Sequence, residues 1–440
     1  MHIKHIIEYE NIRKSQTKIN NTIMSLKYRL TLLSFLQFFI WGAWLITIGG
    51  YWFQNKGWSG TEFGAIFSTM GIASLFMPAL AGVIVDRWVN AEKLLGSFHL
   101  MGAIALFLLP QMTTPASMIS LMLVNMMFYM PTISLSITVS YSAMKKANMD
   151  VVKNYPPIRV WGTVGFIVAM WTVSLLKLET SALQFYVASA ASLLLGIYSF
   201  TLPTCEVSNQ VEKKSLVDSL GLKAFTLFKD KKMAMFFVFS MLLGAALQLT
   251  NAYGDTFLHD FKKIDAFKDL AAIKYPAIIM SISQMSETLF ILTIPFFLRK
   301  FGIKMVMLFS MLAWVLRFGL FGFGDPGDGL WMIILSCIVY GMAFDFFNIS
   351  GSLYIETQTD SSIRGSAQGL FMMMTNGFGA ILGSWSSGLI IDNFFKSENG
   401  NFQWQGIWFT FAAYSLIVAI LFAVFFKHKH DPSKLTSINH

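Results

Sequence analysis

Long apolar runs recur along this 440-residue chain, and they constrain its fold more than any other feature. A helix needs about 20 apolar residues to cross the hydrocarbon core of a bilayer, and the runs reach that length. Because lipid offers the backbone no hydrogen-bond partner, each run must be helical. Charged residues make up only 13 % of the chain, whereas a soluble domain carries roughly 25 %. The sequence therefore predicts an all-α membrane protein.

Twelve runs are expected to span the membrane, six on each side of a polar segment. The first six are 30–53, 61–85, 93–111, 115–142, 158–177 and 182–203. The second six are 233–258, 272–297, 304–324, 330–357, 365–391 and 406–427. This pattern predicts an N-terminal extension (1–29), a six-helix bundle (30–203), a linker (204–232), a second six-helix bundle (233–427) and a tail (428–440).

The distribution of basic residues predicts the orientation of the chain. Cytoplasmic loops of membrane proteins carry an excess of Lys and Arg. With the spans above, 24 of the 33 Lys and Arg fall on the side that holds both termini and the linker, and seven fall on the other side. We therefore expect a multi-pass membrane protein with both termini in the cytoplasm.

Four ionisable side chains stand out within or at the edge of the predicted spans. They are Arg159, Glu287, Arg317 and Asp345. A charge at mid-span costs at least about 2.5–3.5 kcal/mol, so such residues are candidates for function. Glu287 and Asp345 are the carboxylates placed near mid-span, and they are the candidates for binding and releasing a proton. A structural ion pair between Asp345 and Arg317 is the alternative.

Polar and aromatic side chains share helix faces in four spans. They recur at intervals of three or four residues, which places each set on one stripe of its helix. The sets are Arg159, Thr163 and Phe166; Gln248 and Asn251; Gln284 and Glu287; Tyr340 and Phe344. Amides and a carboxylate suit sugar hydroxyls and the edge of a nucleobase, and rings can stack on the base. The alternative for each amide pair is a bond between helices, often worth about 0.6 kcal/mol. Convergence of four spans favours a ligand site.

Two glycine patterns have structural interpretations. Residues 322–327 spell G-x-G-x-x-G, but a predicted span precedes them where a dinucleotide site requires a strand, so we expect a tight external turn. Gly379 and Gly383 form G-x-x-x-G, which allows close packing of helices. Motifs typical of hydrolases, metalloproteases and P-loop enzymes are not found, and the chain is not expected to be an enzyme.

A third pattern lies after the second span, where Gly82, Asp86 and Arg87 read Gly-x-x-x-Asp-Arg. This pattern resembles the cytoplasmic signature loop of the major facilitator superfamily. With twelve spans and a central linker, the resemblance implies a major facilitator fold in which this loop takes part in the conformational change. Ordinary positive charge on the cytoplasmic side is the alternative.

Four longer segments carry a closer resemblance. They are 34–42 (SFLQFFIWG), 156–166 (PPIRVWGTVGF), 281–287 (SISQMSE) and 340–351 (YGMAFDFFNISG). These segments resemble the nucleoside:H⁺ symporter family of the major facilitator superfamily, which includes the bacterial nucleoside and xanthosine permeases. The resemblance covers about residues 24–430. Residues 1–23 have no counterpart in it, so Met24 is the expected start.

The resemblance implies proton-driven nucleoside uptake by alternating access. The family's nucleoside-binding positions match Arg159, Thr163, Phe166, Gln248, Asn251, Gln284, Glu287, Tyr340 and Phe344, and an acidic residue linked to activity matches Asp345. One departure is Ala246, where the family's nucleoside permease carries a carboxylate, so the preference between purine and pyrimidine nucleosides stays open. We expect a monomer in membrane lipid that needs no metal, no nucleic acid and no cofactor beyond the proton gradient. A sugar:H⁺ symporter of the same fold is the alternative.

Overall fold

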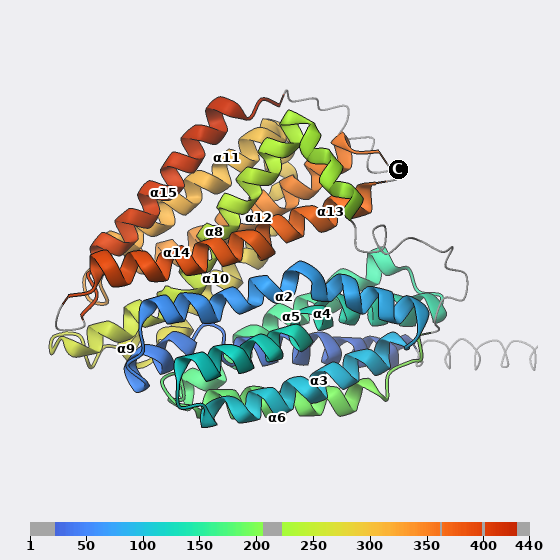
Figure 1. The fold of residues 1–440 in the computed structure, drawn as a ribbon, viewed down its shortest axis with the longest axis horizontal. Helices are drawn as coiled ribbons and strands as arrows, with labels where there is room; N and C mark the ends of the chain where they lie inside the picture. Colours follow the sequence, from blue (N-terminus) through green and yellow to red (C-terminus); the bar gives the residue numbers. More distant parts are fainter. Residues whose placement is uncertain (1–22, 206–221, 361–362, 398–400, 429–440) are drawn as a thin grey trace, which may run out of the picture.

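The computed structural model describes residues 23–205, 222–360, 363–397 and 401–428, which are nearly all helical (Figure 1). Within these ranges the extended backbone is limited to one bridge between Lys396 and Phe402. The predicted extension (1–29), linker (204–232) and tail (428–440) fall largely outside the described residues. Their boundaries therefore stay predictions.

The first half of the chain forms six spans. The first is a helix from Ile23 to Gly42 that continues, after a turn over 43–47, into the π-helical segment η1 (Gly50–Asn55). The others are α2 (Gly60–Arg87), α3 (Ala91–Leu108) with η2 (Leu109–Gln111), α4 (Pro115–Lys146), α5 (Val151–Leu175) and α6 (Leu183–Ser199).

The second half forms six more spans. Its elements are η3 (Leu222–Lys229), α8 (Lys231–Asp260), η4 (Phe261–Lys263), α9 (Ala271–Lys274), α10 (Pro276–Ile291), α11 (Ile294–Phe323), α12 (Leu330–Gln358), α13 (Arg364–Met372), η5 (Met373–Gly379), α14 (Ala380–Ile390), η6 (Ile391–Phe395) and α15 (Trp404–Phe425). The eleventh span is built from α13, η5, α14 and η6 in succession.

A glycine divides α11 between two spans. Gly302 has φ 77° and ψ 169°, a conformation that L side chains rarely adopt. The residues before Gly302 complete the eighth span that α10 begins, and the residues after it form the ninth. Nine described helices are long and apolar enough to cross a membrane. The remaining spans are α6, the segment from α10 to Gly302, and the segment from α13 to η6, which confirms the expected twelve.

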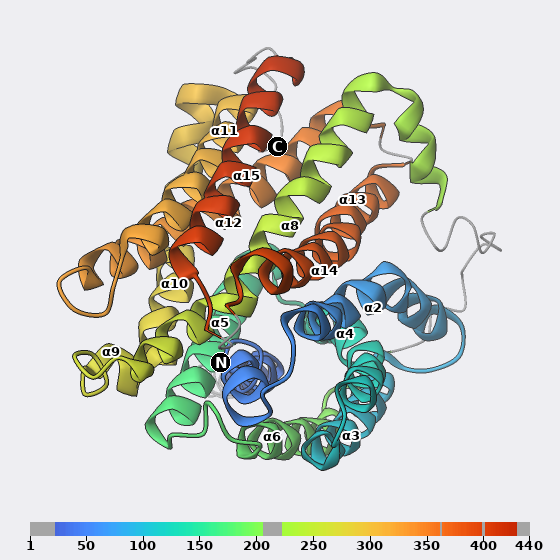
Figure 2. The same cartoon turned by 60° about the vertical axis from the view of Figure 1, so that its left-hand side comes forward.

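The helices pack as two bundles. Figures 1 and 2 show α2–α6 in one bundle and α8–α15 in the other. Between the bundles, α2 packs against α14 and η5, and α5 packs against α10. A Cβ added at Gly64 of α2 would collide with the carbonyl oxygen of Ser384 in α14, so the two backbones touch there. Gly82, near the other end of α2, has open space where a Cβ would stand. The bundles therefore touch where α2 begins, and in Figure 1 the ribbons of α2 and α13 diverge toward the end of α2.

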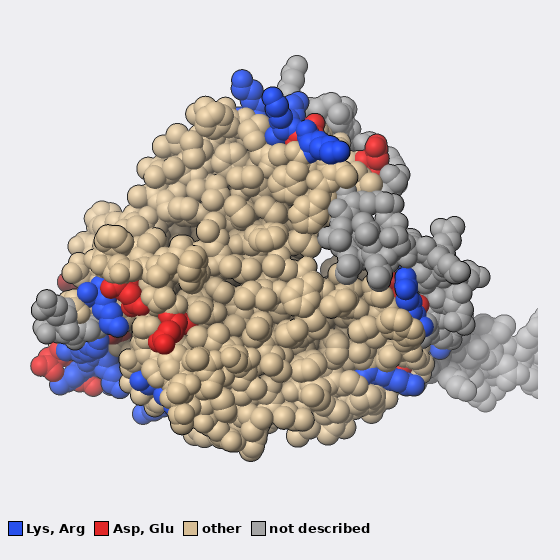
Figure 3. All heavy atoms as spheres, in the orientation of Figure 1, with Lys and Arg blue, Asp and Glu red and all other residues tan. Residues whose placement is uncertain are grey.

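Charged side chains gather at the two ends of the molecule in Figure 3, and a broad uncharged band lies between them. Large apolar side chains are exposed within the spans, including Trp161, Leu194, Leu292 and Val424. Lipid is the solvent that such a band fits.

Candidate substrate site between the two bundles

Arg159 of α5 and Glu287 of α10 face each other across the two bundles. The Arg159 guanidinium lies 4.0 Å from the ring centroid of Phe38 in the first helix. It acts electrostatically on the Glu287 carboxylate and on the Tyr129 hydroxyl. Arg159 and Glu287 are both half-buried. The structure thus brings together a cation and a carboxylate that the sequence placed 128 positions apart in separate spans.

Aromatic rings line the first bundle beside Arg159. Phe166 is buried and meets Trp41 edge-on, with ring centroids 6.4 Å apart and an interplanar angle of 81°. Trp41 also packs on Tyr129 at 5.7 Å. The indole N–H of Trp41 is buried without a hydrogen-bond partner among the described residues. Thr163 stands one turn from Arg159 and is half-buried. These aromatic side chains can stack on a ligand ring, and the Trp41 N–H is available to donate a hydrogen bond to the ligand.

Polar and aromatic groups of the second bundle offer complementary chemistry. Tyr340 and Phe344 of α12 lie nearly parallel, with an interplanar angle of 4° and centroids 5.8 Å apart. The Oε1 atoms of Gln248 in α8 and Gln284 in α10 are buried, and neither has a hydrogen-bond partner in the described structure. Asn251, one turn after Gln248, is half-buried. A buried polar atom without a partner is costly, so these amides are suited to hydrogen-bond a ligand.

The alternative ion pair between Asp345 and Arg317 is not formed. Arg317 is completely buried, and its guanidinium donates to the Ser336 carbonyl oxygen (2.6 Å), to Ser283 Oγ and to Thr250 Oγ1. These bonds tie α11 to α12, α10 and α8, and they explain how a buried cation is tolerated.

Asp345 has a different electrostatic neighbour. It is 5 % exposed, and its Oδ2 atom has no hydrogen-bond partner among the described residues. The charge that acts on it is that of Glu287. The two carboxyl groups therefore titrate together, and the charge of each depends on the other.

A small hollow lies beside Phe344 in the second bundle. It is lined by Trp314 of α11, Asn348 of α12 and Asn376 of η5, together with apolar residues of α8. The sequence analysis missed both asparagines: Asn376 has no polar residue three or four positions away, and Asn348 was not considered although it lies three residues after Asp345. It also missed Gln37, whose Nε2 donates to Thr132 Oγ1 at 2.8 Å.

His99 of α3 is buried and contacts Gln37 Oε1 (2.9 Å) and Ser192 Oγ (3.3 Å), so it is a hydrogen-bonded packing residue. The G-x-G-x-x-G motif at 322–327 begins in the last residues of α11, and the predicted turn between α11 and α12 covers residues 324–329. The Gly379 and Gly383 backbones touch α8. Gly82, Asp86 and Arg87 are exposed in the last turns of α2.

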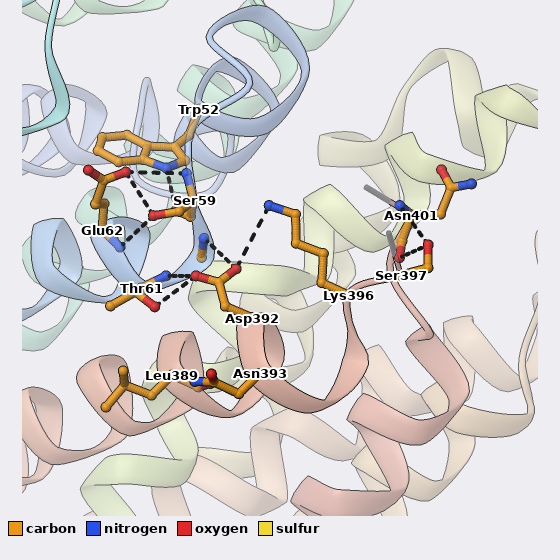
Figure 4. A network of polar contacts seen from close by, with 11 residues as sticks. Trp52, Ser59, Thr61, Glu62, Leu389, Asp392, Asn393, Lys396, Ser397 and Asn401 are labelled. Atoms are coloured by element: carbon orange, nitrogen blue, oxygen red, sulfur yellow. Dashed lines mark hydrogen bonds and ion pairs between the residues drawn. The ribbon is translucent and has the colours of Figure 1, made fainter. Parts of the chain in front are cut away.

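The end of the molecule near the start of α2 is closed by Asp392 of η6 (Figure 4). Its carboxylate accepts hydrogen bonds from the backbone N–H groups of Gly60 (2.9 Å) and Thr61 (2.5 Å) and from the Thr61 hydroxyl (2.7 Å). A carboxylate at a helix N-terminus satisfies free N–H groups and complements the helix dipole. Asp392 of the second bundle thus caps the N-terminus of α2 in the first bundle.

A buried acidic and basic cluster lies at the same end. Glu179, in the turn after α5, contacts His259 of α8, which also contacts Asp255 one turn earlier. The sequence analysis did not include Asp255 among the ionisable residues of the spans, and it ended the seventh span at residue 258. The structure corrects both points, because α8 runs to Asp260 and buries both side chains.

Comparisons of the sequence and of the fold with known proteins indicate the same family. Residues 24–431 match the family described as nucleoside H⁺ symporter. The chain is 54 % identical to the xanthosine permease of Escherichia coli (strain K12) over 413 residues, which cover 94 % of this chain and 98 % of that protein. It is 50 % identical to the nucleoside permease NupG of the same organism over 420 residues, 95 % and 100 % of the two chains. A crystal structure of nucleoside transporter NupG superimposes with a TM-score of 0.87, at 51 % identity, over 92 % of this chain and all of that one.

Proposed function

Because this chain belongs to the nucleoside H⁺ symporter family, we propose that its nucleoside site is the set of polar and aromatic residues between the two bundles. The protein is a multi-pass inner-membrane transporter of the major facilitator fold, not an enzyme, and it moves nucleosides together with protons. The proposed site comprises Arg159, Thr163, Phe166, Gln248, Asn251, Gln284, Glu287, Tyr340 and Phe344.

One observation carries this assignment. Buried amide oxygens that have no hydrogen-bond partner in the described structure lie in the same site as aromatic rings. Gln248 Oε1 and Gln284 Oε1 can accept from ribose hydroxyls or base N–H groups, and the Trp41 N–H can donate to a base carbonyl. Phe166 on one side, and Tyr340 with Phe344 on the other, can stack on the base. A ligand held this way contacts both bundles, so its binding is coupled to their relative movement.

Glu287 and Asp345 are the proposed proton carriers. Glu287 interacts with Arg159 across the bundles, while Asp345 interacts with Glu287 and forms no ion pair with any described Lys or Arg. A proton on one of them changes the charge that the other group and Arg159 experience. Proton binding and nucleoside binding would therefore act on the same interface.

The proposed orientation places both termini and the linker in the cytoplasm. Basic residues predominate on that side, and the ribbons of α2 and α13 diverge there (Figure 1), so the structure corresponds to an inward-facing state. Reporter fusions at residue 210 and at the C-terminus should give a cytoplasmic signal, and a fusion near Asp392 should give an external one. An external signal at residue 210 contradicts the topology. We expect a monomer, since each bundle supplies one side of the site.

Uptake of radiolabelled uridine into a strain without nucleoside transport tests the substrate assignment. Nucleosides in excess should compete, hexoses should not, and a protonophore should abolish accumulation. Competition by hexoses and not by nucleosides would favour a sugar symporter. Xanthosine belongs in the competitor panel, since the two relatives above differ in the substrate that they are named for.

A further inference from the structure

Three titratable side chains meet in the buried interior of the closed end, where Asp255 lies one helical turn of α8 beyond Asn251 of the proposed nucleoside site. His259 Nε2 lies 3.1 Å from Glu179 Oε2 and 3.4 Å from Asp255 Oδ2. Glu179, Asp255 and His259 are 3 %, 0 % and 7 % exposed. Glu179 belongs to the first bundle, and the other two belong to α8 of the second. The cluster therefore bridges the bundles.

The cluster is incompletely satisfied by its surroundings. Glu179 Oε1 accepts from the backbone N–H of Ala277 at the start of α10, at 3.1 Å. Neither oxygen of Asp255 accepts a hydrogen bond from any described residue, although the side chain is completely buried. A buried carboxylate that faces only another carboxylate and an imidazole is stable when the cluster binds positive charge, in the form of protons or a metal ion.

Few other charges face the cluster. Lys262 of η4 acts electrostatically on His259 and is the one additional charge acting on it among the described residues. Gly50 of η1 packs against the cluster, since an added Cβ there would stand 3.4 Å from His259 Cδ2. The Ala277 N–H of α10 donates to Glu179. The charge of the cluster is thus set mainly by its own protons.

The net charge of the cluster depends on how many protons it holds. With both carboxylates ionised, the formal charge of the three groups is −2 when His259 is neutral and −1 when it is protonated. A second proton brings the charge to zero. Burial disfavours net charge, so the closed end is stabilised as protons are added to the cluster.

Opening of this end must break the cluster. The interface of α2 with α14 and the Asp392 cap would separate, and Glu179 would leave Asp255 and His259. Each group would then be hydrated and could keep its charge independently. The closed state therefore binds more protons than the open state.

We propose that Glu179, Asp255 and His259 form a proton-binding site that latches the external end closed. This site goes beyond the proposed nucleoside site and the Glu287–Asp345 pair, and it makes external acidity favour the inward-facing state. The inference rests on alternating access by the two bundles and on the proposed orientation. It does not depend on which residues hold the nucleoside.

A pair of spin labels can measure this closure. Leu176→Cys at the end of α5 and Asp265→Cys after η4 place labels on exposed positions of the two bundles, and both native cysteines are buried. In purified full-length protein, the ratio of closed to open molecules should rise about tenfold per pH unit of acidification for each proton linked to closure. The isosteric variant Glu179→Gln should lose this pH dependence, and so should His259→Gln.

Glu92→Gln is the matched control. Glu92 is also a buried carboxylate of the first bundle, but its Oε2 accepts from Cys205 of the same bundle at the opposite end. Its substitution should leave the pH dependence intact. An unchanged pH dependence in both Glu179→Gln and His259→Gln would overturn the proposal.

Adding a chelator shows whether the cluster binds a proton or a metal ion. The three ligand atoms lie within 4.8 Å of one another, a spacing that a divalent cation could also occupy. With EDTA present, the pH-dependent closure should persist. Loss of the closed population on chelation, restored by Zn²⁺, would identify a metal site and overturn the proton assignment. Uridine binding by Glu179→Gln, measured in parallel, should be retained, so failure of the latch is distinguishable from failure of the nucleoside site.

Discussion

Two of the places where the bundles meet handle their polar groups in opposite ways. At the Asp392 cap, a carboxylate of one bundle is fully hydrogen-bonded by the backbone and a hydroxyl of the other. At midspan, Gln248, Gln284 and Asp345 each keep a buried polar atom that has no hydrogen-bond partner among the described residues. Satisfied groups hold a closed interface, whereas groups left unsatisfied mark where a ligand or a proton completes the structure.

The largest effect that tests this contrast is expected at Asp345. Asp345→Asn removes the titratable carboxyl and keeps the shape of the side chain, so binding and counterflow exchange of uridine should continue. Accumulation driven by a pH gradient should fall to the external concentration. Transport assays in proteoliposomes measure both quantities. Intact gradient-driven accumulation would assign the proton to Glu287, and the same result in Glu287→Gln would exclude both residues.

Packing of α2 gives the next largest effect. An added methyl at Gly64 meets the Ser384 carbonyl oxygen, and overpacking of this kind costs about 1–3 kcal/mol. Gly64→Ala should therefore lower the thermal midpoint and the closed fraction reported by the spin labels at 176 and 265. Gly82→Ala is the control, because its Cβ has open space and alanine favours a helix. Equal stability of the two variants would show that the closed interface is elsewhere.

Removal of the Asp392 cap should have a smaller effect. Loss of a helix cap costs about 0.5–2 kcal/mol, which corresponds to a roughly 2- to 30-fold shift of the closed population toward the open one. Asp392→Ala should show this shift in the same spin-label measurement, and Asp328→Ala, at an exposed loop position, should not. No shift in Asp392→Ala would mean that the cap contributes little to closure.

The number of spans and the two bundles could be predicted from sequence because lipid imposes both a length and a helical backbone on every crossing. The interruptions of regular helix within the spans could not be predicted from sequence. The turn at 43–47 and the π-helical segments η5 and η6 depend on the hydrogen-bond register inside each span, which apolar composition does not determine. Gly302 is the exception, since it lies beside a basic stretch that marks a loop.

Spacing identified candidate residues only where two or more share one helix face. It found Gln248 with Asn251 and Tyr340 with Phe344, but it could not find Asn376, which has no polar residue three or four positions away, and it did not consider Trp41, which lies four residues after Gln37. Asp255 and His259 do have a spacing of four residues. They escaped notice because the seventh span was ended before His259, so one histidine was assigned to a loop and its carboxylate partner was not considered.

Calorimetry on purified protein tests the central claim most directly. The claim is that the buried amides between the bundles hold the nucleoside, so Gln284→Ala should weaken uridine binding by about 1–3 kcal/mol, or roughly 5- to 150-fold. Arg159→Ala and Asn251→Ala should weaken it in the same range, while Gln358→Ala, at an exposed helix end, should bind like the parent protein. Parent-like affinity in Gln284→Ala, Arg159→Ala and Asn251→Ala together would show that the nucleoside binds elsewhere.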